Sequence, residues 1–76
     1  MDIKKGVYEH YRGKKYVVLG IGLDKNSQNE SVIYKPLYEC EYEYFIRALA
    51  DFCSSVTIEG KEVPKFTYIG PYDPLA

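Results

Sequence analysis

The segment KKYVVLGIGL, residues 14–23, decides the fold class of this 76-residue chain. Its apolar and β-branched residues alternate with a period of two, which is typical of a β-strand rather than of a helix. One face of the strand is expected to carry Val17, Leu19, Ile21 and Leu23, and the other Tyr16, Val18 and two glycines. Gly20 and Gly22 predict a bend or bulge where another backbone comes close. The sequence therefore predicts a β-protein built around this strand.

Segments with the same period lie on both sides of it. Further strands are expected over GVYEHY (6–11), SVIYKPLYEC (31–40) and YEYFIRAL (42–49), and a closing hairpin over VTIEGKEVPKFTYI (56–69). Arg12-Gly13 and Glu59-Gly60 are expected to form tight turns between strands. The polar run 24–30 lacks any periodicity and is expected to be a loop.

Three local signals refine this arrangement. Pro36 removes a donor from the sheet ladder, so its strand is expected at an edge of the sheet or with a bulge at that point. Residues 48–56 are too short and too serine-rich for an independent helix, and we expect a single helical turn packed by Phe52. The turn-rich tail, residues 70–76, is expected to be ordered only where Tyr72 or Leu75 docks on a surface.

These elements predict one mostly β domain over residues 1–76, with its core in residues 6–69. We expect a small, strongly bent antiparallel sheet or an SH3-like partial barrel, with one short helical turn. A chain of this length buries only about 60% of the surface of its unfolded form. The small core and the Pro-marked edge strand therefore predict self-association, most simply as a dimer.

The charge and the cysteine content argue against several classes of function. Ten Lys and Arg against eleven Asp and Glu give a net charge of −1, which argues against a nucleic-acid polymer as partner. No apolar run approaches the ~20 residues of a membrane helix. Two separated cysteines without a signal-peptide core favour a reduced, cytoplasmic protein over a Cys40–Cys53 disulfide. One histidine and two distant cysteines predict no metal site, and no cofactor is expected.

Nine tyrosines and three phenylalanines make the chain unusually aromatic. Tyrosine suits both small cores and ligand sites, because it joins an apolar ring to a polar tip. The candidate ligand-binding residues are Tyr8, His10, Tyr11, Arg12, Tyr34 and Arg47. Together they supply ring faces, hydroxyl donors and guanidinium forks, which a planar anionic ligand such as a nucleotide needs.

The same residues also have an interpretation without a ligand. Tyrosines at period two are typical of half-buried sheet positions, and His10 is then an ordinary strand residue. Arg47 would pair with a carboxylate, and the neighbouring choices are Glu41, Glu43 and Asp51. The binding hypothesis is sharper, because it requires His10 and Arg47 to line one site with Tyr11 and Tyr34 as its aromatic walls.

Catalysis has less support than binding. A single histidine can act as an acid or a base. No Gly-x-Ser-x-Gly elbow or comparable nucleophile accompanies it, and the lone Gly-x-Gly at residues 20–22 precedes no helical pattern. We therefore expect a protein that is not an enzyme.

Motifs along most of the chain carry a family resemblance. They are Gly6, Tyr8, His10, Tyr11, Arg12 and Gly13, then YVVLG (16–20), VIYKPLY (32–38), Arg47, Phe52, and Gly60 through VPKF (63–66). In order and spacing, over residues 6–69, they resemble small bacterial and phage domains designated domain of unknown function sixteen fifty-three (DUF1653). That pattern opens with Tyr-Arg-His-Tyr-Lys-Gly, runs through Val-Val-Tyr and Trp-Val-Arg-Pro, and closes with Val-Pro-Arg-Phe.

The chain departs from that pattern at two places. Phe45-Ile46-Arg47-Ala48 stands where the family has Trp-Val-Arg-Pro, and DKNSQNE (24–30) replaces a loop resembling His-Ser-Glu-Thr. The resemblance implies a compact, stand-alone domain, and it brings no established activity. His10 and Arg47 both fall on motifs of the pattern, which favours a shared site for them.

Two functions from different classes follow. The first is a non-catalytic small-molecule binding domain, for a nucleotide or a nucleotide-derived signal. The occurrence of the resembling family in phages extends this to a sponge that sequesters a host defence messenger. The alternative is an SH3-like module that holds a protein or peptide on its tyrosine-rich face.

Overall fold

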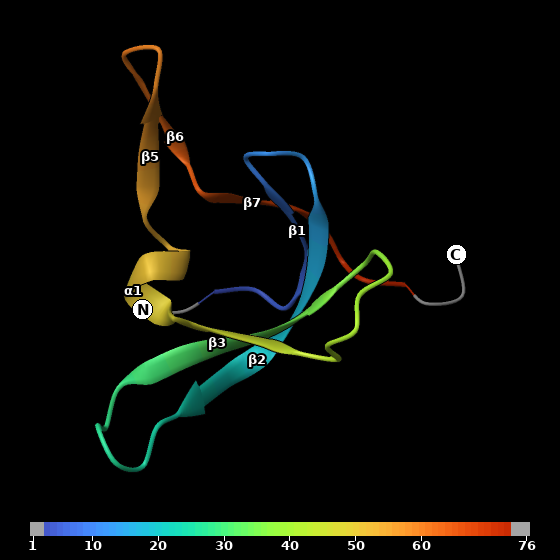
Figure 1. The fold of residues 1–76 in the computed structure, drawn as a ribbon, viewed down its shortest axis with the longest axis vertical. Coiled ribbons are helices and arrows are strands. Elements are labelled where there is room, and N and C mark those ends of the chain that lie inside the picture. The colour runs from blue at the N-terminus through green and yellow to red at the C-terminus, as the bar shows by residue number, and fades with distance from the viewer. Residues whose placement is uncertain (1–2, 74–76) are drawn as a thin grey trace.

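The computed structural model describes residues 3–73 as a mostly β protein (Figure 1). In chain order the elements are β1 (Gly6–His10), β2 (Lys15–Leu23), β3 (Glu30–Pro36), β4 (Phe45–Ala48), α1 (Leu49–Phe52), β5 (Ser55–Ile58), β6 (Lys61–Pro64) and β7 (Phe66–Gly70). The predicted helical turn is present, and it carries Phe52 into the core as expected.

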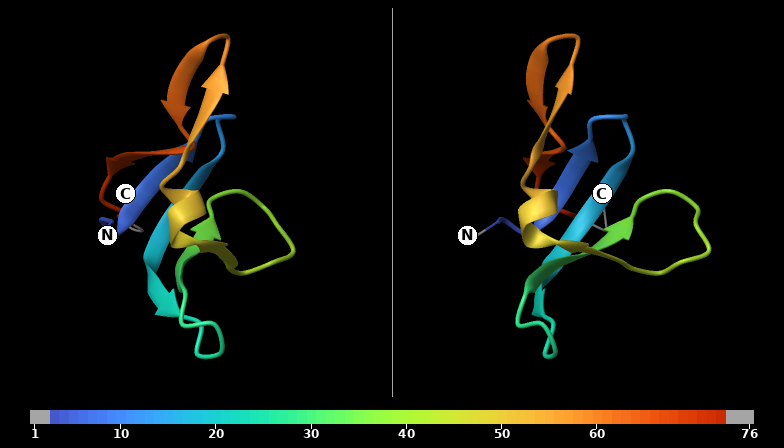
Figure 2. Two further views of the ribbon diagram at one scale, coloured as in Figure 1. Left: turned by 90° about the vertical axis from the view of Figure 1, so that its left-hand side faces the viewer. Right: turned by 60° about the vertical axis from the view of Figure 1, so that its left-hand side comes forward.

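The strands form one five-stranded sheet and one separate hairpin. The sheet has the order β4-β3-β2-β1-β7, and its neighbouring strands are antiparallel. Its edges, β4 and β7, do not pair with each other, so the bent sheet remains open rather than closing into a barrel. The β5–β6 hairpin projects from the body, and α1 lies against one side of the sheet (Figure 2). The prediction of a strongly bent antiparallel sheet with one helical turn is confirmed.

The predicted turns and bulge are present in the structure. Gly13 has a φ of 104° in the β1–β2 turn. Glu59 and Gly60 join β5 to β6 with φ values of 51° and 80°, the two positive values of a type I′ turn, whose twist matches that of the flanking strands. A register shift between Val18 and Gly20 places a bulge in β2.

This bulge corrects the predicted faces of β2. Before it, Val18 pairs with Tyr34, and beyond it Ile21 pairs with Val32. Paired residues share a face, so Ile21 lies on the face of Val18 and not on that of Val17. The expectation of one uninterrupted apolar face from Val17 to Leu23 is therefore wrong, because the bulge inserts one residue and exchanges the faces.

The position predicted for Pro36 is also wrong. Its strand, β3, lies inside the sheet between β2 and β4, and no register shift occurs at Pro36. The ladder between β3 and β4 extends no further than the Tyr34–Phe45 pair. Pro36 lies beyond that pair at the end of β3, so its missing N–H interrupts no bond to β4.

The strands predicted over residues 31–40 and 42–49 end earlier or begin later in the structure, as β3 and β4. The last strand of the predicted closing hairpin pairs elsewhere. Residues 37–44 form a loop between β3 and β4, with the side chains of Tyr42 and Tyr44 exposed. Phe66–Gly70 does not continue the closing hairpin but crosses to pair with β1. The Lys65 amide donates to the Ser54 carbonyl at 3.0 Å, and the Lys65 carbonyl accepts from Tyr11 at 3.0 Å. Lys65 therefore joins the hairpin to the sheet.

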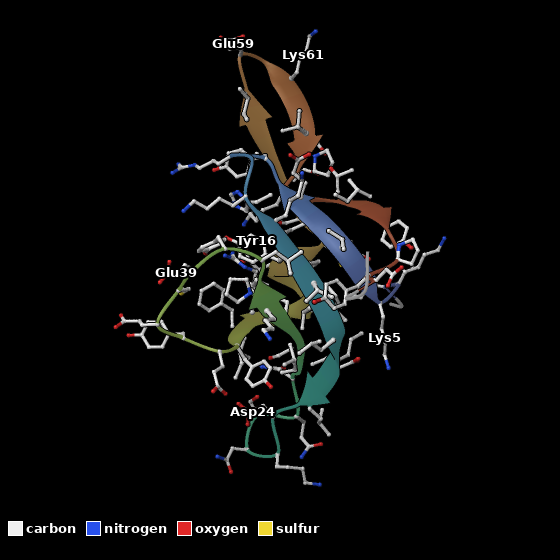
Figure 3. All side chains as sticks on the ribbon, turned by 90° about the vertical axis from the view of Figure 1, so that its right-hand side faces the viewer. Lys5, Tyr16, Asp24, Glu39, Glu59 and Lys61 are labelled. Atoms are coloured by element: carbon white, nitrogen blue, oxygen red, sulfur yellow. The ribbon has the colours of Figure 1, made fainter. Side chains whose placement is uncertain are left out.

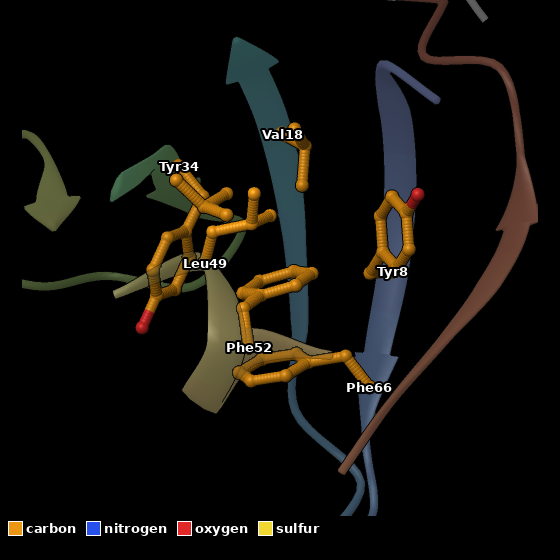
Figure 4. Packing of buried hydrophobic residues seen from close by; sticks show 7 residues of the cluster. Tyr8, Val18, Tyr34, Leu49, Phe52 and Phe66 are labelled. Carbon is orange, nitrogen blue, oxygen red and sulfur yellow. The ribbon is translucent and has the colours of Figure 1, made fainter. Parts of the chain in front are cut away.

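The core lies between α1 and the sheet face that β1, β2 and β3 present to it (Figure 4). Its buried members are Tyr8, Val18, Val32, Tyr34, Leu49, Phe52 and Phe66. Phe52 from α1 stacks on Phe66 from β7, with ring centroids 4.1 Å apart and planes 6° apart. This aromatic pair fixes the helical turn above the sheet, and with it the residues that flank the turn.

Two residues of the tail share a hollow with the sheet. Tyr72 and Pro71 line a hollow of about 340 Å³ together with Lys5, Gly6 and residues 17–19 of β2. The expected docking of Leu75 falls outside the described residues.

Candidate functional site

Arg47 occupies the core side of β4, where it pairs with Val32 of β3. Its Nε donates to the Tyr34 hydroxyl at 3.1 Å, and one terminal nitrogen donates to Asp51 Oδ2 at 2.5 Å. The guanidinium carbon lies 5.4 Å from the centre of the Phe66 ring, which adds a cation–π contact. The bond to Tyr34 and then that to Asp51 raise the pKa of Arg47, so its side chain stays charged.

Lys65 approaches the same carboxylate from the other side. Its Nζ donates to Asp51 Oδ1 at 2.6 Å, so one carboxylate bridges an ammonium and a guanidinium. The hydrogen bonds from Lys65 and from Arg47 hold the pKa of Asp51 below its usual value. The carboxylate is therefore ionised at neutral pH and neutralises one of its two cations.

His10 lies beside these charges at the end of β1. Its ring meets the edge of Phe66 with centroids 5.0 Å apart, because His10 and Phe66 are paired across β1 and β7. Nδ1 accepts from the Arg12 amide at 3.2 Å, which leaves Nε2 to carry the proton of the neutral ring. Burial, and then the charges of Arg47, Arg12 and Lys65, lower the pKa of His10. The imidazole is accordingly a neutral donor at pH 7.

Aromatic rings support this group of charges. Tyr11 packs on His10 with centroids 4.4 Å apart, and Arg12 lies over the Tyr11 ring at 5.6 Å. Deeper in, the hydroxyl of Tyr16 (labelled in Figure 3) lies 3.1 Å from that of Tyr38. We refer to the side chains of His10, Arg12, Arg47, Asp51 and Lys65 as the cationic cluster. It holds three permanent cations and one carboxylate, so its net charge is positive.

Comparison with known proteins identifies the family. The model of the family described as protein of unknown function, DUF1653, matches residues 6–68. The chain belongs to the DUF1653 family. The crystal structure of a DUF1653 protein from Bordetella bronchiseptica superposes with a TM-score of 0.86 at 30% identity, over 96% of this chain and 95% of that chain. No curated protein matches the chain significantly. The resemblance inferred from the motifs is thus confirmed.

In this DUF1653 domain, the structure brings four of the six predicted binding residues to one place. They are His10, Tyr11, Arg12 and Arg47. Tyr34 reaches the cluster only through its hydroxyl, because its ring is 4% exposed and packs inside the core. Tyr11 and Phe66, and not Tyr34, are the rings beside the charges.

Tyr8 lies apart from the others. Its ring is buried between Phe52 and Tyr68, with centroids 5.4 Å away from each. Its hydroxyl donates to the Lys4 carbonyl at 2.9 Å. Burial raises the pKa of Tyr8 despite that bond. The structure gives Tyr8 a place in the core of the DUF1653 domain, away from the cationic cluster.

Sequence reasoning missed Lys65 and the bridging position of Asp51. Lys65 stands in VPKF, where the family pattern has Val-Pro-Arg-Phe, so a basic residue at that motif was an available signal. From the sequence alone, Asp51 is only one of three carboxylates near Arg47. The structure selects it because it follows Arg47 by four residues across the helical turn.

The cationic cluster is partly exposed: Arg12 is exposed, and its other four residues are half-buried. The hollow near Tyr72 lies away from it, and a second hollow of about 410 Å³ is lined by residues 29–30 and 48–50. Within residues 3–73, no group of three or more His, Cys, Asp or Glu is placed to hold a metal ion. Cys40 and Cys53 are both free thiols. No helix in the described part of the chain is long and apolar enough to cross a membrane.

Proposed function

We propose that this DUF1653 domain binds a small planar anion, a nucleotide or a nucleotide-derived signal, without converting it. The observation that carries the proposal is the positive cluster beside one exposed ring, Tyr11, and one buried ring, Phe66. Besides burial, three cations lower the pKa of the His10 imidazole, namely Arg47, Arg12 and Lys65. Only one carboxylate, that of Asp51, pairs with two of them. Anionic groups are favoured where several cations share one carboxylate.

The arrangement suits a ligand with one flat part and one charged part. Tyr11 is 37% exposed, and Arg12 lies over its ring. A base that takes the place of the Arg12 side chain would stack there, and stacking of a base on an aromatic ring contributes about 1–3 kcal/mol. The guanidinium of Arg47 is a planar fork that matches the geometry of phosphate and carboxylate oxygens. His10 adds a neutral donor through Nε2. The surface therefore has a donor side and a stacking side next to each other.

The cluster favours binding over turnover. His10 uses Nδ1 to accept from the Arg12 amide and meets rings on its flanks. Among residues 3–73, no hydroxyl or thiol is seen paired with it as a nucleophile would be. In this proposal the domain acts by sequestration, as a phage-type sponge would for a host defence messenger.

Thermal unfolding in the presence of nucleotides tests the proposal. A ligand at 100 times its dissociation constant stabilises the folded state by about 2.7 kcal/mol. We expect such a shift with at least one member of a panel of nucleoside phosphates and cyclic dinucleotides, and recovery of that ligand intact. Arg47→Lys keeps the charge, loses the fork, and should weaken the shift. Lys61→Ala, at the exposed first residue of β6, is the control. No shift with any member, or an equal shift in Arg47→Lys, contradicts the proposal.

A peptide-binding module is the second candidate, favoured by the loop at residues 37–44. Tyr42 and Tyr44 are 63% and 54% exposed there and alternate with glutamates. Exposed tyrosine beside carboxylates suits a basic peptide. Binding of an Arg- and Lys-rich peptide, lost in the Tyr42→Ser/Tyr44→Ser double variant, would support this module. Retention of binding in that variant would exclude the loop as its site.

A further inference from the structure

We infer that the Asp51 carboxylate occupies the position that the anionic group of the ligand takes on binding. A terminal phosphate of the ligand then displaces the Asp51 carboxylate from between Arg47 and Lys65. This inference rests on the proposed function. The inference adds to that function the chemical class of the anionic group and the residue that competes with this group.

The geometry of Asp51 is that of a bridging anion. Its two oxygens contact two different cations, Oδ2 at 2.5 Å from Arg47 and Oδ1 at 2.6 Å from Lys65. The two cations come from distant parts of the chain, one from β4 and one from the junction between β6 and β7. Like charges repel, and the carboxylate between Arg47 and Lys65 offsets that repulsion. Any group with two oxygens on one centre satisfies the same geometry.

The cations are fixed more firmly than the carboxylate. The side chain of Asp51 is 44% exposed, whereas those of Arg47 and Lys65 are 33% and 17% exposed. Both ion pairs are part-buried, and Asp51 is the member with the most access to water, so water can solvate its charge when the pairs separate. Asp51 therefore moves into water by rotation of its own side chain, while Leu49 and Phe52 keep the turn in the core.

The guanidinium remains aimed after the carboxylate leaves. Arg47 Nε donates to Tyr34, and the ring of Phe66 lies beneath the guanidinium. Neither contact involves Asp51. Besides burial, the charges of Arg47, Arg12 and Lys65 all act on His10 and lower its pKa, so His10 and Arg12 belong to the same positively charged region. The exchange thus exposes a preorganised set of donors and needs no movement of the backbone.

Charge selects among the anions. A ligand group with one negative charge is attracted to Arg47 and Lys65 no more strongly than the Asp51 carboxylate that it would replace. A terminal phosphate carries about −1.5 to −2 charges at pH 7 and has three acceptor oxygens. It can contact Arg47 and Lys65 with two oxygens and still keep a third acceptor oxygen, which the carboxylate of Asp51 lacks. A phosphodiester carries only one charge and two free oxygens, so we expect it to bind more weakly.

Calorimetric titration of the full chain with AMP and with cyclic AMP tests the selection, because the two probes share a base and differ in the charge of the phosphate. We expect AMP to bind more tightly, and inorganic phosphate to compete with it. Equal affinities, or no competition by phosphate, overturn the inference even where a nucleotide binds. These measurements need no variant, so they are independent of any effect on folding.

Asp51→Asn tests the competition directly. Removal of the internal anion should raise the affinity for AMP by about fivefold or more, within the usual range of coupling between two binding events. Asp24→Asn is the matched control, because it removes the same charge from the β2–β3 turn, where the carboxylate accepts from Asn26 at 2.9 Å. Affinity that is unchanged or lower in Asp51→Asn overturns the inference and leaves the proposed function standing. Failure of every probe to bind the wild-type chain overturns both.

Discussion

The Nε of Arg47 donates to the hydroxyl of Tyr34 at 3.1 Å, and this bond joins the core of the domain to its cationic cluster. The ring of Tyr34 packs edge-on against Phe52 and Phe66, at 5.5 Å and 5.8 Å between centroids. Its hydroxyl points away from the other core side chains (Figure 4), and it is the part of Tyr34 that meets Arg47. One residue thus serves the core with its ring and the site with its oxygen, and substitutions can separate the two roles.

We expect Tyr34→Phe to lower the free energy of unfolding by only about 1 kcal/mol, because it removes one hydrogen bond and keeps the ring. Tyr34→Ala should lower it by about 3–5 kcal/mol, as truncation of a buried aromatic ring does. Urea unfolding measures both. If Tyr34→Ala instead leaves stability intact and abolishes ligand binding, the ring stacks on the ligand and its place in the core is not what holds the fold.

Stability should fall on the acid side of neutrality because of His10. Burial and neighbouring cations place its pKa in the folded chain below the ordinary value of 6.5. As pH falls through 6.5, the unfolded chain therefore takes up this proton before the folded chain does. Because the state that binds more protons is favoured by acid, the free energy of unfolding decreases from pH 7 downward.

The variant His10→Gln should flatten this dependence between pH 5 and 7, as measured by urea unfolding at several pH values. Asp51 titrates in a separate window. Its pKa lies below 3.8, so the stability that it contributes is present above that pH and is lost only in stronger acid. An unchanged slope between pH 5 and 7 in His10→Gln would mean that another group causes it.

Gly6 is required by its contacts and its backbone angle. It has a φ of 142°, and a Cβ added there would lie 2.6 Å from the carbonyl oxygen of Gly70 and 2.9 Å from the ring of Tyr68. We expect Gly6→Ala to destabilise the domain strongly, because β1 and β7 would have to separate. Gly22→Ala is the matched control within a strand, since its Cβ would meet only the Ile33 side chain at 3.4 Å. Thermal unfolding compares them, and equal melting temperatures would refute the close approach of β1 and β7.

The sequence predicts the local elements well, because period and turn residues are local properties. The alternation in residues 14–23 predicts β2, and Gly60 predicts the hairpin turn. The faces of β2 beyond Gly20 depend on which residue of β3 lies opposite, so alternation alone assigns them wrongly. Pro36 likewise restricts its neighbours without revealing that β3 is internal.

The candidate site shows the same division. His10, Tyr11 and Arg12 are adjacent in sequence, so their proximity follows from one strand and its turn. The approach of Lys65 to Asp51 follows from the return of the chain after the β5–β6 hairpin, which no local pattern encodes. Burial separates the tyrosines, because only the fold decides that the ring of Tyr34 is covered and that of Tyr11 is exposed.

Self-association remains a prediction. Because β3 is internal in the sheet and β7 is an edge strand, we expect the interface at β7 and not at β3. β7 is an edge strand of five residues, Phe66–Gly70, and none of them is charged. The opposite edge, β4, is shorter and contains Arg47. Uncharged edge strands pair readily with another chain, and a charged residue in the edge prevents this.

We therefore expect two copies to pair β7 with β7 in antiparallel fashion, as a two-fold axis requires. Ile69 is 49% exposed on this edge, and Ile69→Lys should convert the dimer to a monomer in sedimentation experiments at micromolar concentration. Ile46→Lys places the same charge on β4, where Ile46 is 72% exposed, and should leave the dimer intact. A wild-type chain that sediments as a monomer removes the prediction. A dimer that Ile46→Lys dissociates and Ile69→Lys does not would assign the interface to β4, because each substitution places its charge on only one edge of the sheet.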